Sequence, residues 1–356
     1  MTINIGIIGF GFIGHIHEQS LADRNQMKVI AICDIDSEKM NDSITKNVIK
    51  TTSVDELLKI KTIDTVIVSV FNDAHKEVVI KAAIAGKNII CEKPAAMNVS
   101  EFDEMMAVVN EKKVKFTVHQ QRRLDNDFRT AKKVYEKKEL GNIYTVQSKL
   151  YGLNGNMHDW HIYKKHGGGM LYDWGVHLID QMLYMIDSKI ISIFADVRNV
   201  INEEVDDYFK ILLEFENGIM GEIELGTYYL TDKPHWFERH WFIGGDKGSM
   251  YSDGFIPEGK VVKTSRLLEN VPGKTVMTAS GPTRSFGTVA DGILMTEELP
   301  VTNYNYQMFY DNYVNTLQGT DDFLVKQSEV RRVLSVMQAV RESGLKKESI
   351  KFKNGL

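Results

Sequence analysis

The sequence predicts an α/β protein with two parts: an N-terminal doubly wound parallel sheet, then a C-terminal α+β domain with a large, mainly antiparallel open sheet. The first third of the chain alternates short apolar runs with helical patterns, which is typical of parallel βαβ units. Later segments alternate apolar and polar residues with period two, as half-buried antiparallel strands do. With 356 residues and 43% hydrophobic content, the chain can form two cores. We expect a first domain over residues 1–121 and a second over 122–356.

The N-terminal run predicts a strand, a glycine turn, a helix and a second strand. Ile3–Ile8 is apolar, the helical stretch runs to about Asp23, and the second strand, Val29–Cys33, is followed by Asp34. The turn has the pattern GxGxxG and consists of Gly9, Phe10, Gly11, Phe12, Ile13 and Gly14. This order, with an acidic residue at the end of the second strand, indicates the dinucleotide-binding turn of a Rossmann fold.

The residues of this turn suit a dinucleotide physically. Gly9 permits the tight turn, Gly11 lets a pyrophosphate approach the helix N-terminus, and Gly14 lets the helix pack on the strand. Asp34 can accept hydrogen bonds from an adenosine ribose and would repel a 2′-phosphate, and the two residues after it add no cation. NAD is therefore expected in preference to NADP. A glycine turn with a purely structural role is the alternative.

The rest of the first sheet is predicted from further apolar runs. Strands are expected near Val48 and at Asp64–Val70, Asn88–Cys91 and Lys115–Val118, with helices at Val54–Ile60, Ala74–Ala85 and Ser100–Lys112. Ligands of such sheets bind outside the carboxyl ends of the strands. Three tips point there: the glycine turn, Val70-Phe71-Asn72 and Glu92-Lys93-Pro94.

Composition narrows the class of partner. A formal net charge of -5 provides no basic field for nucleic acid or an anionic membrane, so a small molecule is expected. The two cysteines, Cys33 and Cys91, make no disulfide framework, which fits a reducing cytoplasm. The apolar N-terminus is broken by glycines and lacks a basic segment, so we interpret it as a strand and turn, and no other window reaches the length of a membrane span.

The stretch Gly167–Asp187 predicts a helix that carries chemistry. Asp173 and His177 stand four residues apart, on one face, while Leu178, Met182, Met185 and Ile186 mark an apolar face. Histidine titrates near neutral pH and suits the removal of a hydroxyl proton, and an aspartate one turn away can fix its tautomer. The alternative is an ordinary Asp/His pair on a solvated face.

Lys93 is the third candidate for this chemistry. Oxidation of a secondary alcohol moves a hydride to a nicotinamide while the hydroxyl loses a proton, so a base and a cation or hydrogen-bond donor are needed beside the oxygen. Lys93 follows a strand at its carboxyl end, and Pro94 stiffens the turn that presents it. The alternative for Lys93 is an ordinary surface lysine.

Three segments in order resemble the Gfo/Idh/MocA oxidoreductase family over nearly the whole chain. They are SVFNDAHKEVVIKAAIAGKNIICEKPAAMN with its Glu-Lys-Pro signature, HQQRRLDNDFRTAKK, and the Gly167–Asp180 helix. The resemblance implies that Lys93 assists proton movement and touches the nicotinamide ribose, that His177 is the acid/base, and that Asp173 supports it. Phe71 and Gln121 differ from the residues that the family more often has at these positions. The difference affects the expected contacts to the nicotinamide and not the expected fold.

The expected cofactor contacts follow from the three strand tips and the resemblance. They are Gly9, Phe10, Gly11, Phe12, Ile13, Gly14, Asp34, Val70, Phe71, Asn72, His75, Glu92, Lys93 and Gln121.

The second domain is predicted to begin near Arg122. Helices are expected at Asn126–Lys138, Tyr304–Leu317 and Ser328–Leu345; strands at Ile143–Tyr151, Ile190–Val200, Tyr208–Phe215, Ile219–Leu230, Arg239–Phe242 and Ser249–Tyr251; and loops with short strands over residues 254–300. Asn217-Gly218 is a hairpin signal. One sheet face should pack on helices. The other, with Ile223, Leu225 and Trp241 or their neighbours, is expected to form a homodimer or homotetramer.

The loop before the catalytic helix is expected to contact substrate. His158, Trp160 and neighbouring Asp159 and His161 offer a ring that can stack on a sugar face and polar groups for its hydroxyls, so substrate contacts are expected from His158, Trp160, Lys93, Asp173 and His177. A metal site of His158, His161, His177 and Asp159 is the competing hypothesis, but no metal is expected, because the loop pair has no evident second shell. His235, Trp236 and His240 either cap the site or pack at a sheet edge.

Together these features predict an NAD-dependent oxidoreductase acting on a secondary hydroxyl of a sugar, glycoside or cyclitol. An alternative uses the same first step in an NAD-dependent glycosidase, with transient oxidation, elimination and no net redox. A third class is a non-enzymatic NAD-sensing protein, but cofactor binding alone would not require Lys93, Asp173 and His177.

Overall fold

A computed structural model describes residues 2–152, 157–229, 237–269, 274–285 and 291–352. The first sheet contains six parallel strands in the order β3-β2-β1-β4-β5-β6. Its strands are β1 (Ile3–Ile8), β2 (Met27–Cys33), β3 (Ile49–Thr51), β4 (Thr65–Val68), β5 (Asn88–Cys91) and β6 (Phe116–Val118). Its helices are α1 (Phe12–Leu21), α2 (Val54–Lys59), α3 (His75–Ile84) and α4 (Val99–Glu111). The predicted doubly wound sheet is confirmed.

The strand order sets the position of the ligand crevice. The chain leaves β1 toward β2 on one side and later returns to β4 on the other, so the order reverses between β1 and β4. In such sheets ligands bind at the carboxyl end of this reversal. The glycine turn follows β1, and the tip Val70-Phe71-Asn72 follows β4, so both predicted tips flank the reversal.

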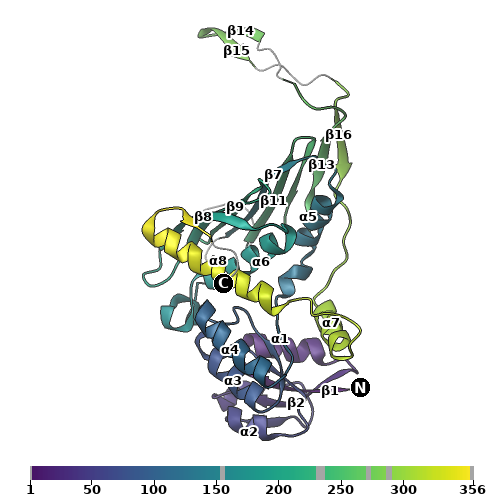
Figure 1. The fold of residues 1–356 in the computed structure, drawn as a ribbon, viewed down its shortest axis with the longest axis vertical. Coiled ribbons are helices and arrows are strands. Elements are labelled where there is room, and N and C mark those ends of the chain that lie inside the picture. Colours follow the sequence, from purple (N-terminus) through teal and green to yellow (C-terminus); the bar gives the residue numbers. More distant parts are fainter. Residues whose placement is uncertain (1, 153–156, 230–236, 270–273, 286–290, 353–356) are drawn as a thin grey trace.

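Helix α7 (Gln307–Leu317) belongs to the core of the first sheet, although it lies far beyond residue 121 in the chain (Figure 1). Phe309, Tyr310, Tyr313 and Val314 are buried in one cluster with the apolar residues of β1, β2 and α1. Tyr313 Oη also lies 3.0 Å from Thr65 Oγ1 on β4. The division at residue 121 stays a prediction for the rest of the chain, but α7 packs with the first sheet.

The second sheet has nine strands in the order β16-β13-β12-β11-β7-β10-β9-β8-β17. All neighbours are antiparallel except β7 and β10, which are parallel. The strands are β7 (Ile143–Gly152), β8 (Ile190–Arg198), β9 (Tyr208–Phe215), β10 (Met220–Gly226), β11 (Phe237–Gly245), β12 (Gly248–Asp253), β13 (Glu258–Thr264), β16 (Leu294–Glu298) and β17 (Ile350–Lys351). Asn217-Gly218 turns β9 into β10, as predicted, with Gly218 at φ +85°.

Helices cover one face of this sheet, namely α5 (Asn126–Lys137), α6 (Val176–Met185) and α8 (Gln327–Lys346) (Figure 1). Ile223, Leu225 and Trp241 are buried on this covered face. The prediction that these three residues form the oligomer surface is therefore wrong. Their sequence neighbours Glu222 and Glu224 belong to the opposite face, because successive side chains of a strand alternate.

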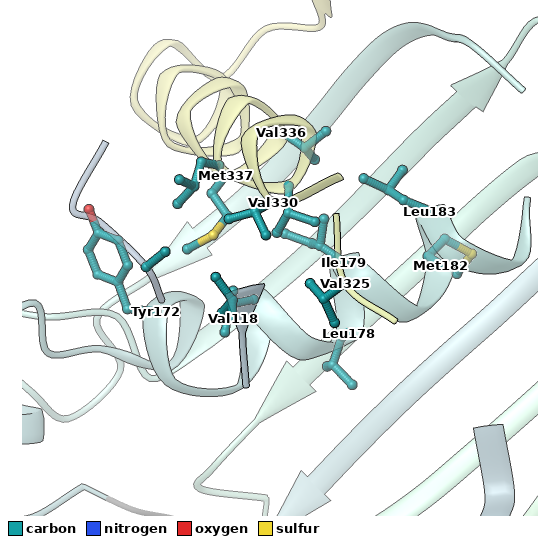
Figure 2. Close-up of a cluster of buried hydrophobic side chains, with 14 of the residues drawn as sticks. Val118, Tyr172, Leu178, Ile179, Met182, Leu183, Val325, Val330, Val336 and Met337 are labelled. Atoms are coloured by element: carbon teal, nitrogen blue, oxygen red, sulfur yellow. The ribbon is translucent and has the colours of Figure 1, made fainter. Parts of the chain in front are cut away.

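Helix α6 lies between the second sheet and α8, so it is buried on nearly every side. Figure 2 shows Ile179 and Leu183 of α6 on the side of α8, where Val330 and Val336 lie, and Leu178 on the opposite side of α6. The predicted apolar face is real, but the sandwiched position buries His177, Asp180 and Gln181 as well. A polar side chain on this helix therefore needs a partner inside the protein.

The helix starts later than the glycine run suggests. Leu171–Gly175 is a π-helical turn, and α6 follows it directly. The glycines before it are engaged elsewhere: Gly169 N–H donates to His161 O at 2.9 Å. Asp206 accepts hydrogen bonds from the next two backbone amides. Its carbonyl oxygen accepts the Met170 N–H, and its carboxylate accepts the Leu171 N–H at 2.6 Å. A helix N-terminus leaves such amides without an intrahelical partner, and Asp206 supplies one.

Residues 254–300 contain more structure than their sequence indicates. β13 and β16 extend the second sheet, and β14 (Lys274–Thr278) pairs with β15 (Gly281–Ser285) in a separate hairpin. Figure 1 shows this hairpin projecting beyond the end of the sheet that is farthest from β1 and β2. None of the described helices combines the length and the apolar composition needed to cross a lipid bilayer.

Candidate active site

Two of the three predicted turn glycines are required by the protein's own packing. Gly9 has φ +90°, and a Cβ there would lie 2.4 Å from Ser69 O. A Cβ on Gly14 would lie 2.4 Å from Gly9 O. These contacts hold the start of α1 against the ends of β1 and β4, which is the close approach that glycine permits.

Gly11 differs, because a Cβ there would meet no protein atom within 4 Å. It is the N-cap of α1, whose first amides have no intrahelical partner. Two apolar side chains near it in the chain are open to solvent, since Phe12 is 80% exposed and Ile35, which follows Asp34, is 89% exposed. An open glycine at a helix N-terminus beside exposed apolar surface fits a dinucleotide with its pyrophosphate on α1. Phe10 is buried and Ile13 half-buried, so they shape the turn from beneath.

Asp34 is held by the turn that it follows. Its Oδ2 accepts the Phe10 N–H at 2.7 Å, and its Oδ1 accepts the Asp36 N–H at 2.9 Å. Lys39 Nζ lies 3.8 Å from Oδ1. The two residues that follow Asp34 in the sequence are not cationic. The short helix Ser37–Met40 turns the chain so that Lys39, five residues later, lies near Asp34.

The second tip joins the first sheet to the glycine run before the catalytic helix. Asn72 is buried, and its Nδ2 donates to Gly167 O at 3.0 Å. Phe71 is 44% exposed, and Val70 is half-buried. His75 is buried completely, with ring nitrogens 2.8 Å from Pro94 O and 3.1 Å from Val70 O. His75 therefore connects the tip after β4 with the tip after β5 inside the protein. The sequence predicts a cofactor contact for it instead.

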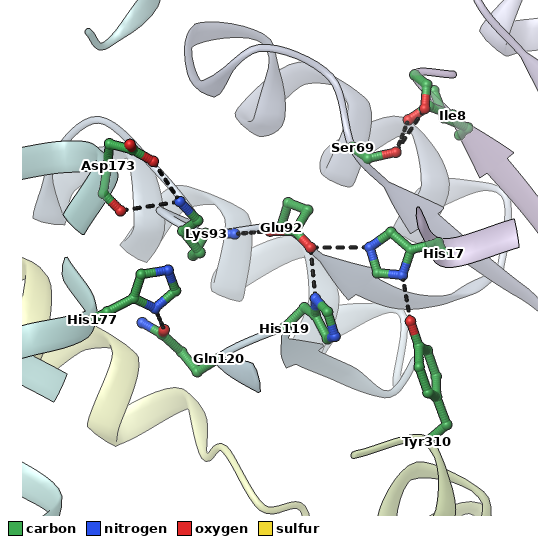
Figure 3. A network of polar contacts seen from close by, with 11 residues as sticks. Ile8, His17, Ser69, Glu92, Lys93, His119, Gln120, Asp173, His177 and Tyr310 are labelled. Carbon is green, nitrogen blue, oxygen red and sulfur yellow. Dashed lines mark hydrogen bonds and ion pairs between the residues drawn. The ribbon is translucent and has the colours of Figure 1, made fainter. Parts of the chain in front are cut away.

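Glu92 is the centre of a buried polar network (Figure 3). Its Oε1 lies 3.0 Å from His17 Nε2 and 2.7 Å from His119 Nδ1, and its Oε2 accepts the Lys93 N–H at 3.1 Å. Tyr310 of α7 completes the network 2.8 Å from His17 Nδ1. Burial acts to raise the pKa of Glu92, but the two histidines outweigh it and leave the pKa well below its usual value. Glu92 is thus a structural hub beneath the Lys93 turn.

Lys93 pairs with Asp173 across the gap between the two domains. Its Nζ donates to Asp173 Oδ1 at 2.8 Å and to Asp173 O at 3.0 Å. The side chains are only 14% and 7% exposed. The sequence predicts that Asp173 orients His177, and this stays a prediction; the structure shows the Asp173 carboxylate in contact with Lys93 (Figure 3).

His177 has an orienting partner that sequence reasoning missed. Its Nδ1 lies 2.7 Å from Oε1 of Gln120, which follows β6. Burial, then the positive charges of Lys93 and Arg122, hold the pKa of His177 well below its usual value. The ring is therefore neutral at physiological pH. The only sequence signal for Gln120 was two adjacent glutamines after an apolar strand, of which Gln121 was the one predicted.

Gln121 itself retains an open hydrogen-bonding position. Its Oε1 is buried and has no hydrogen-bond partner among the described residues. Buried polar atoms in folded proteins nearly always have a partner, and the carboxamide of a nicotinamide is one that this acceptor could bind.

The predicted substrate loop folds into two short 3₁₀ turns, Asp159–Ile162 and Lys164–His166. Trp160 stacks on His161, with ring centroids 3.9 Å apart, and lies 5.9 Å from the ring of Phe71. Burial lowers the pKa of His161, while the charge of Asp173 acts in the opposite direction. His158 is exposed and pairs with Asp159 at 2.8 Å. Trp160 and His161 thus border the Lys93–Asp173 pair, and His158 lies further out.

His158, His161, His177 and Asp159, the residues of the competing metal hypothesis, do not come together as a ligand cluster in the structure. Within the described ranges, ligand-type atoms converge at His17, Glu92 and His119. Hydrogen bonds to Glu92 and Tyr310 already engage three of the four ring nitrogens there. His235 and Trp236 lie outside the described residues, and His240 pairs with Asp253.

A cavity of about 980 Å³ is lined by residues that include Arg122, Trp174 and Phe255, but Lys93, Asp173 and His177 do not line it. Trp174 forms part of its wall, and the ring of Trp174 lies 6.1 Å from that of His177. The Arg122 guanidinium lies 3.9 Å above the Trp174 ring and bonds Asp125 at 3.0 Å, with Phe255 near by. Arg123, in contrast, is buried against Asp180 and Glu329 and is structural.

Comparison with known proteins identifies the family of the chain. Residues 3–120 match the family model described as the oxidoreductase family with an NAD-binding Rossmann fold, and residues 128–251 match the GFO/IDH/MocA C-terminal domain. The chain belongs to the Gfo/Idh/MocA oxidoreductase family. The resemblance seen in the sequence is confirmed, and so is the NAD-binding character of the first domain.

Relatives within the family span most of the chain. The uncharacterized oxidoreductase C115.03 of Schizosaccharomyces pombe is 30% identical over 320 residues, which cover 86% of each chain. Myo-inositol 2-dehydrogenase of Thermotoga maritima is 26% identical over 269 residues, 74% of this chain and 78% of its own. The crystal structure of an NAD-binding protein from Listeria innocua has a TM-score of 0.86 and 30% identity, covering 100% of this chain and 98% of that one.

Proposed function

We propose that this member of the Gfo/Idh/MocA family is an NAD-dependent dehydrogenase that oxidises a secondary hydroxyl of a sugar, glycoside or cyclitol. One observation carries the proposal: Lys93, Asp173 and His177 meet at the carboxyl edge of the first sheet, with a buried cation 2.8 Å from its carboxylate and a neutral imidazole near by. A cation and a neutral base beside one oxygen are what hydroxyl oxidation needs.

In this reaction His177 takes the hydroxyl proton, and Lys93 donates a hydrogen bond to the same oxygen as negative charge grows on it. Asp173 keeps the Lys93 ammonium in position, because its backbone oxygen and its Oδ1 both accept hydrogen bonds from Nζ. Bound NAD supplies the hydride acceptor, with Gly11, Asp34 and Gln121 as its contacts. The substrate carbon loses a hydride and its oxygen a proton, which leaves a ketone.

The loop residues Trp160 and His158 are proposed to contact the substrate from one side. The second candidate is an NAD-dependent glycosidase that oxidises a glycoside transiently, eliminates the aglycone and returns the hydride, and it would use the same Lys93, Asp173 and His177.

The first experiment quantifies nicotinamide cofactors released from the denatured purified protein, then scans a panel of sugars, cyclitols and glycosides for reduced cofactor and for free aglycone. Accumulating NADH with a polyol supports the dehydrogenase. Tightly held NAD with aglycone release and no net NADH supports the glycosidase. Hydride transfer to NAD with no member of the panel, and no loss of any activity in His177→Ala, would overturn both.

We also propose a homodimer or homotetramer formed through the uncovered face of the second sheet. Phe194, Met220 and Tyr251 come from three strands of this sheet, alternate with buried residues, and are 40–45% exposed. A second copy would remove this apolar area from water. Light scattering of wild type and Met220→Glu tests this, since one added charge at an interface should shift the protein toward monomer.

Cys33 and Cys91 are both buried and unbonded, a state that a reducing compartment preserves, so we propose a cytoplasmic enzyme. Fractionation of the producing cells tests this.

A further inference from the structure

We propose that Gln120 is a positioning residue that selects the tautomer of His177, so that Nδ1 carries the proton and Nε2 presents its lone pair to the substrate. The inference deepens the proposed function and depends on it for its catalytic meaning. It starts from one contact, the 2.7 Å distance between His177 Nδ1 and Gln120 Oε1. Both residues are buried, at 2% and 4% exposure, so water does not compete for this bond.

Gln120 is well placed to hold the ring because its own backbone is fixed. Its N–H donates to Val118 O at 2.8 Å, and its carbonyl accepts the Arg123 N–H at 3.1 Å. The first bond ties it to β6, and the second ties it to the short helix Gln121–Leu124. The side chain therefore starts from a rigid connection between the two domains.

The orientation of the glutamine amide follows from the charges on the other side of the ring. Figure 3 shows the second ring nitrogen of His177 on the side of Lys93, while the first faces Gln120. An ammonium repels an N–H and attracts a lone pair. With Lys93 on that side, Nε2 is the unprotonated nitrogen and Nδ1 carries the hydrogen. A protonated Nδ1 needs an acceptor, so Gln120 presents its oxygen rather than its NH₂ group.

A neutral partner also suits a base that must stay uncharged before the reaction. A carboxylate at position 120 would stabilise the imidazolium and raise the pKa of His177. An amide fixes the tautomer without that effect. The charged and titratable groups around the ring are Lys93 from the tip after β5, Arg122 from the helix after β6, Glu92 and His119 beneath it, and Asp173 from its own helix.

The test combines two variants with a readout that does not need turnover. Wild type, Gln120→Glu and Gln120→Met are labelled with ¹⁵N-histidine, and the His177 signals, identified by their loss in His177→Asn, report the protonated nitrogen. Wild type should show the Nδ1–H form. Gln120→Met should show a mixture, and Gln120→Glu should keep Nδ1–H with a raised His177 pKa. Gln318→Glu, which adds the same charge at the exposed end of α7, is the matched control.

The kinetic parameters of the two Gln120 variants should change in line with the protonation of His177. Gln120→Glu should move the acidic limb of the kcat/KM profile up by about 1–3 pH units. Gln120→Met should lower kcat about 10–100-fold with KM within about twofold, because only the base is misdirected. An Nε2–H form in wild type, or a Gln120→Glu profile that coincides with wild type, would overturn the proposal. If no substrate is ever turned over, the proposed function fails, while the NMR tautomer still decides the role of Gln120.

Discussion

The Lys93 ammonium donates to both the side-chain Oδ1 and the backbone oxygen of Asp173, at 2.8 and 3.0 Å. Lys93 comes from the first sheet, and Asp173 comes from the turn that starts the buried helix of the second domain. The pair therefore joins the two domains at the place where the reaction is proposed. Removing either member would leave the other buried without its charge partner.

Substitutions of this pair should separate chemistry from positioning. Lys93→Met removes the group that stabilises the oxygen, so kcat should fall about 100–10,000-fold. Asp173→Asn keeps an acceptor for Lys93 but loses its charge, so the fall should be about tenfold smaller. Steady-state kinetics on the substrate found by the panel measure both. Equal losses in the two variants would contradict this order. Circular dichroism and the melting temperature of both variants serve as the control for folding.

The glycine turn provides a prediction that separates stability from cofactor binding. Gly9→Ala forces a Cβ to 2.4 Å from a backbone oxygen at positive φ, so it should lower the free energy of unfolding by about 1–3 kcal/mol or more. Gly11→Ala meets no protein atom and has an ordinary φ of -81°, so stability should change by less than about 0.5 kcal/mol.

The same Gly11→Ala variant should bind NAD at least about tenfold more weakly, because its methyl group occupies the space proposed for the pyrophosphate. Thermal unfolding and calorimetric titration with NAD measure the two effects. Unchanged NAD affinity in a folded Gly11→Ala protein would remove the dinucleotide from this position.

Coenzyme preference should depend on the pair Asp34 and Lys39. Asp34 should disfavour the 2′-phosphate of NADP in wild type, but Lys39 Nζ lies 3.8 Å from Asp34 Oδ1. Asp34→Ser should therefore improve kcat/KM for NADP relative to NAD about tenfold or more. The substitution removes the carboxylate that repels the 2′-phosphate and leaves the Lys39 ammonium in place. Asp34→Ser combined with Lys39→Ala should lose most of that gain, and a gain of equal size in the double variant would exclude Lys39 from the effect.

Stability should fall when the pH drops below neutrality. Burial lowers the pKa of His17, His75 and His177 from a usual value of 6.5. Between 6.5 and these lower values the unfolded chain binds more protons than the folded one, so the free energy of unfolding decreases as pH falls through this range. The melting temperature should therefore decline between pH 7 and pH 5. His158→Gln, at an exposed histidine, should show the same decline, and a flat profile in wild type would contradict the prediction.

The first sheet could be predicted almost to the residue, and the reason is physical. Strands buried on both faces form continuous apolar runs, and β1 and β5 match the predicted bounds. The dinucleotide turn can be predicted equally well from the sequence, because local backbone geometry requires its glycines. Gly9 and Gly14 are needed by contacts within the turn and its adjoining strands.

The site was only partly predictable, because its contacts join distant segments. Asp173 and Lys93 stand eighty positions apart, and no local pattern links them. The pair of glutamines after β6 does not indicate which of the two contacts His177, and Gln121 rather than Gln120 is the one that the sequence predicts. The second sheet showed two alternating faces, but the alternation does not say which face the helices cover, and Ile223, Leu225 and Trp241 were assigned to the wrong one.

The packing of α7 against β1 and β4 has a consequence for how the protein is made. Phe309, Tyr310 and Tyr313 are synthesised after most of the second domain, yet they close the apolar face of the first sheet. While the ribosome is still translating the intervening residues, this face of β1 and β2 has contacts from α1 but lacks those from α7. The apolar cover of the first sheet is therefore complete only after residues 309–314 have been synthesised.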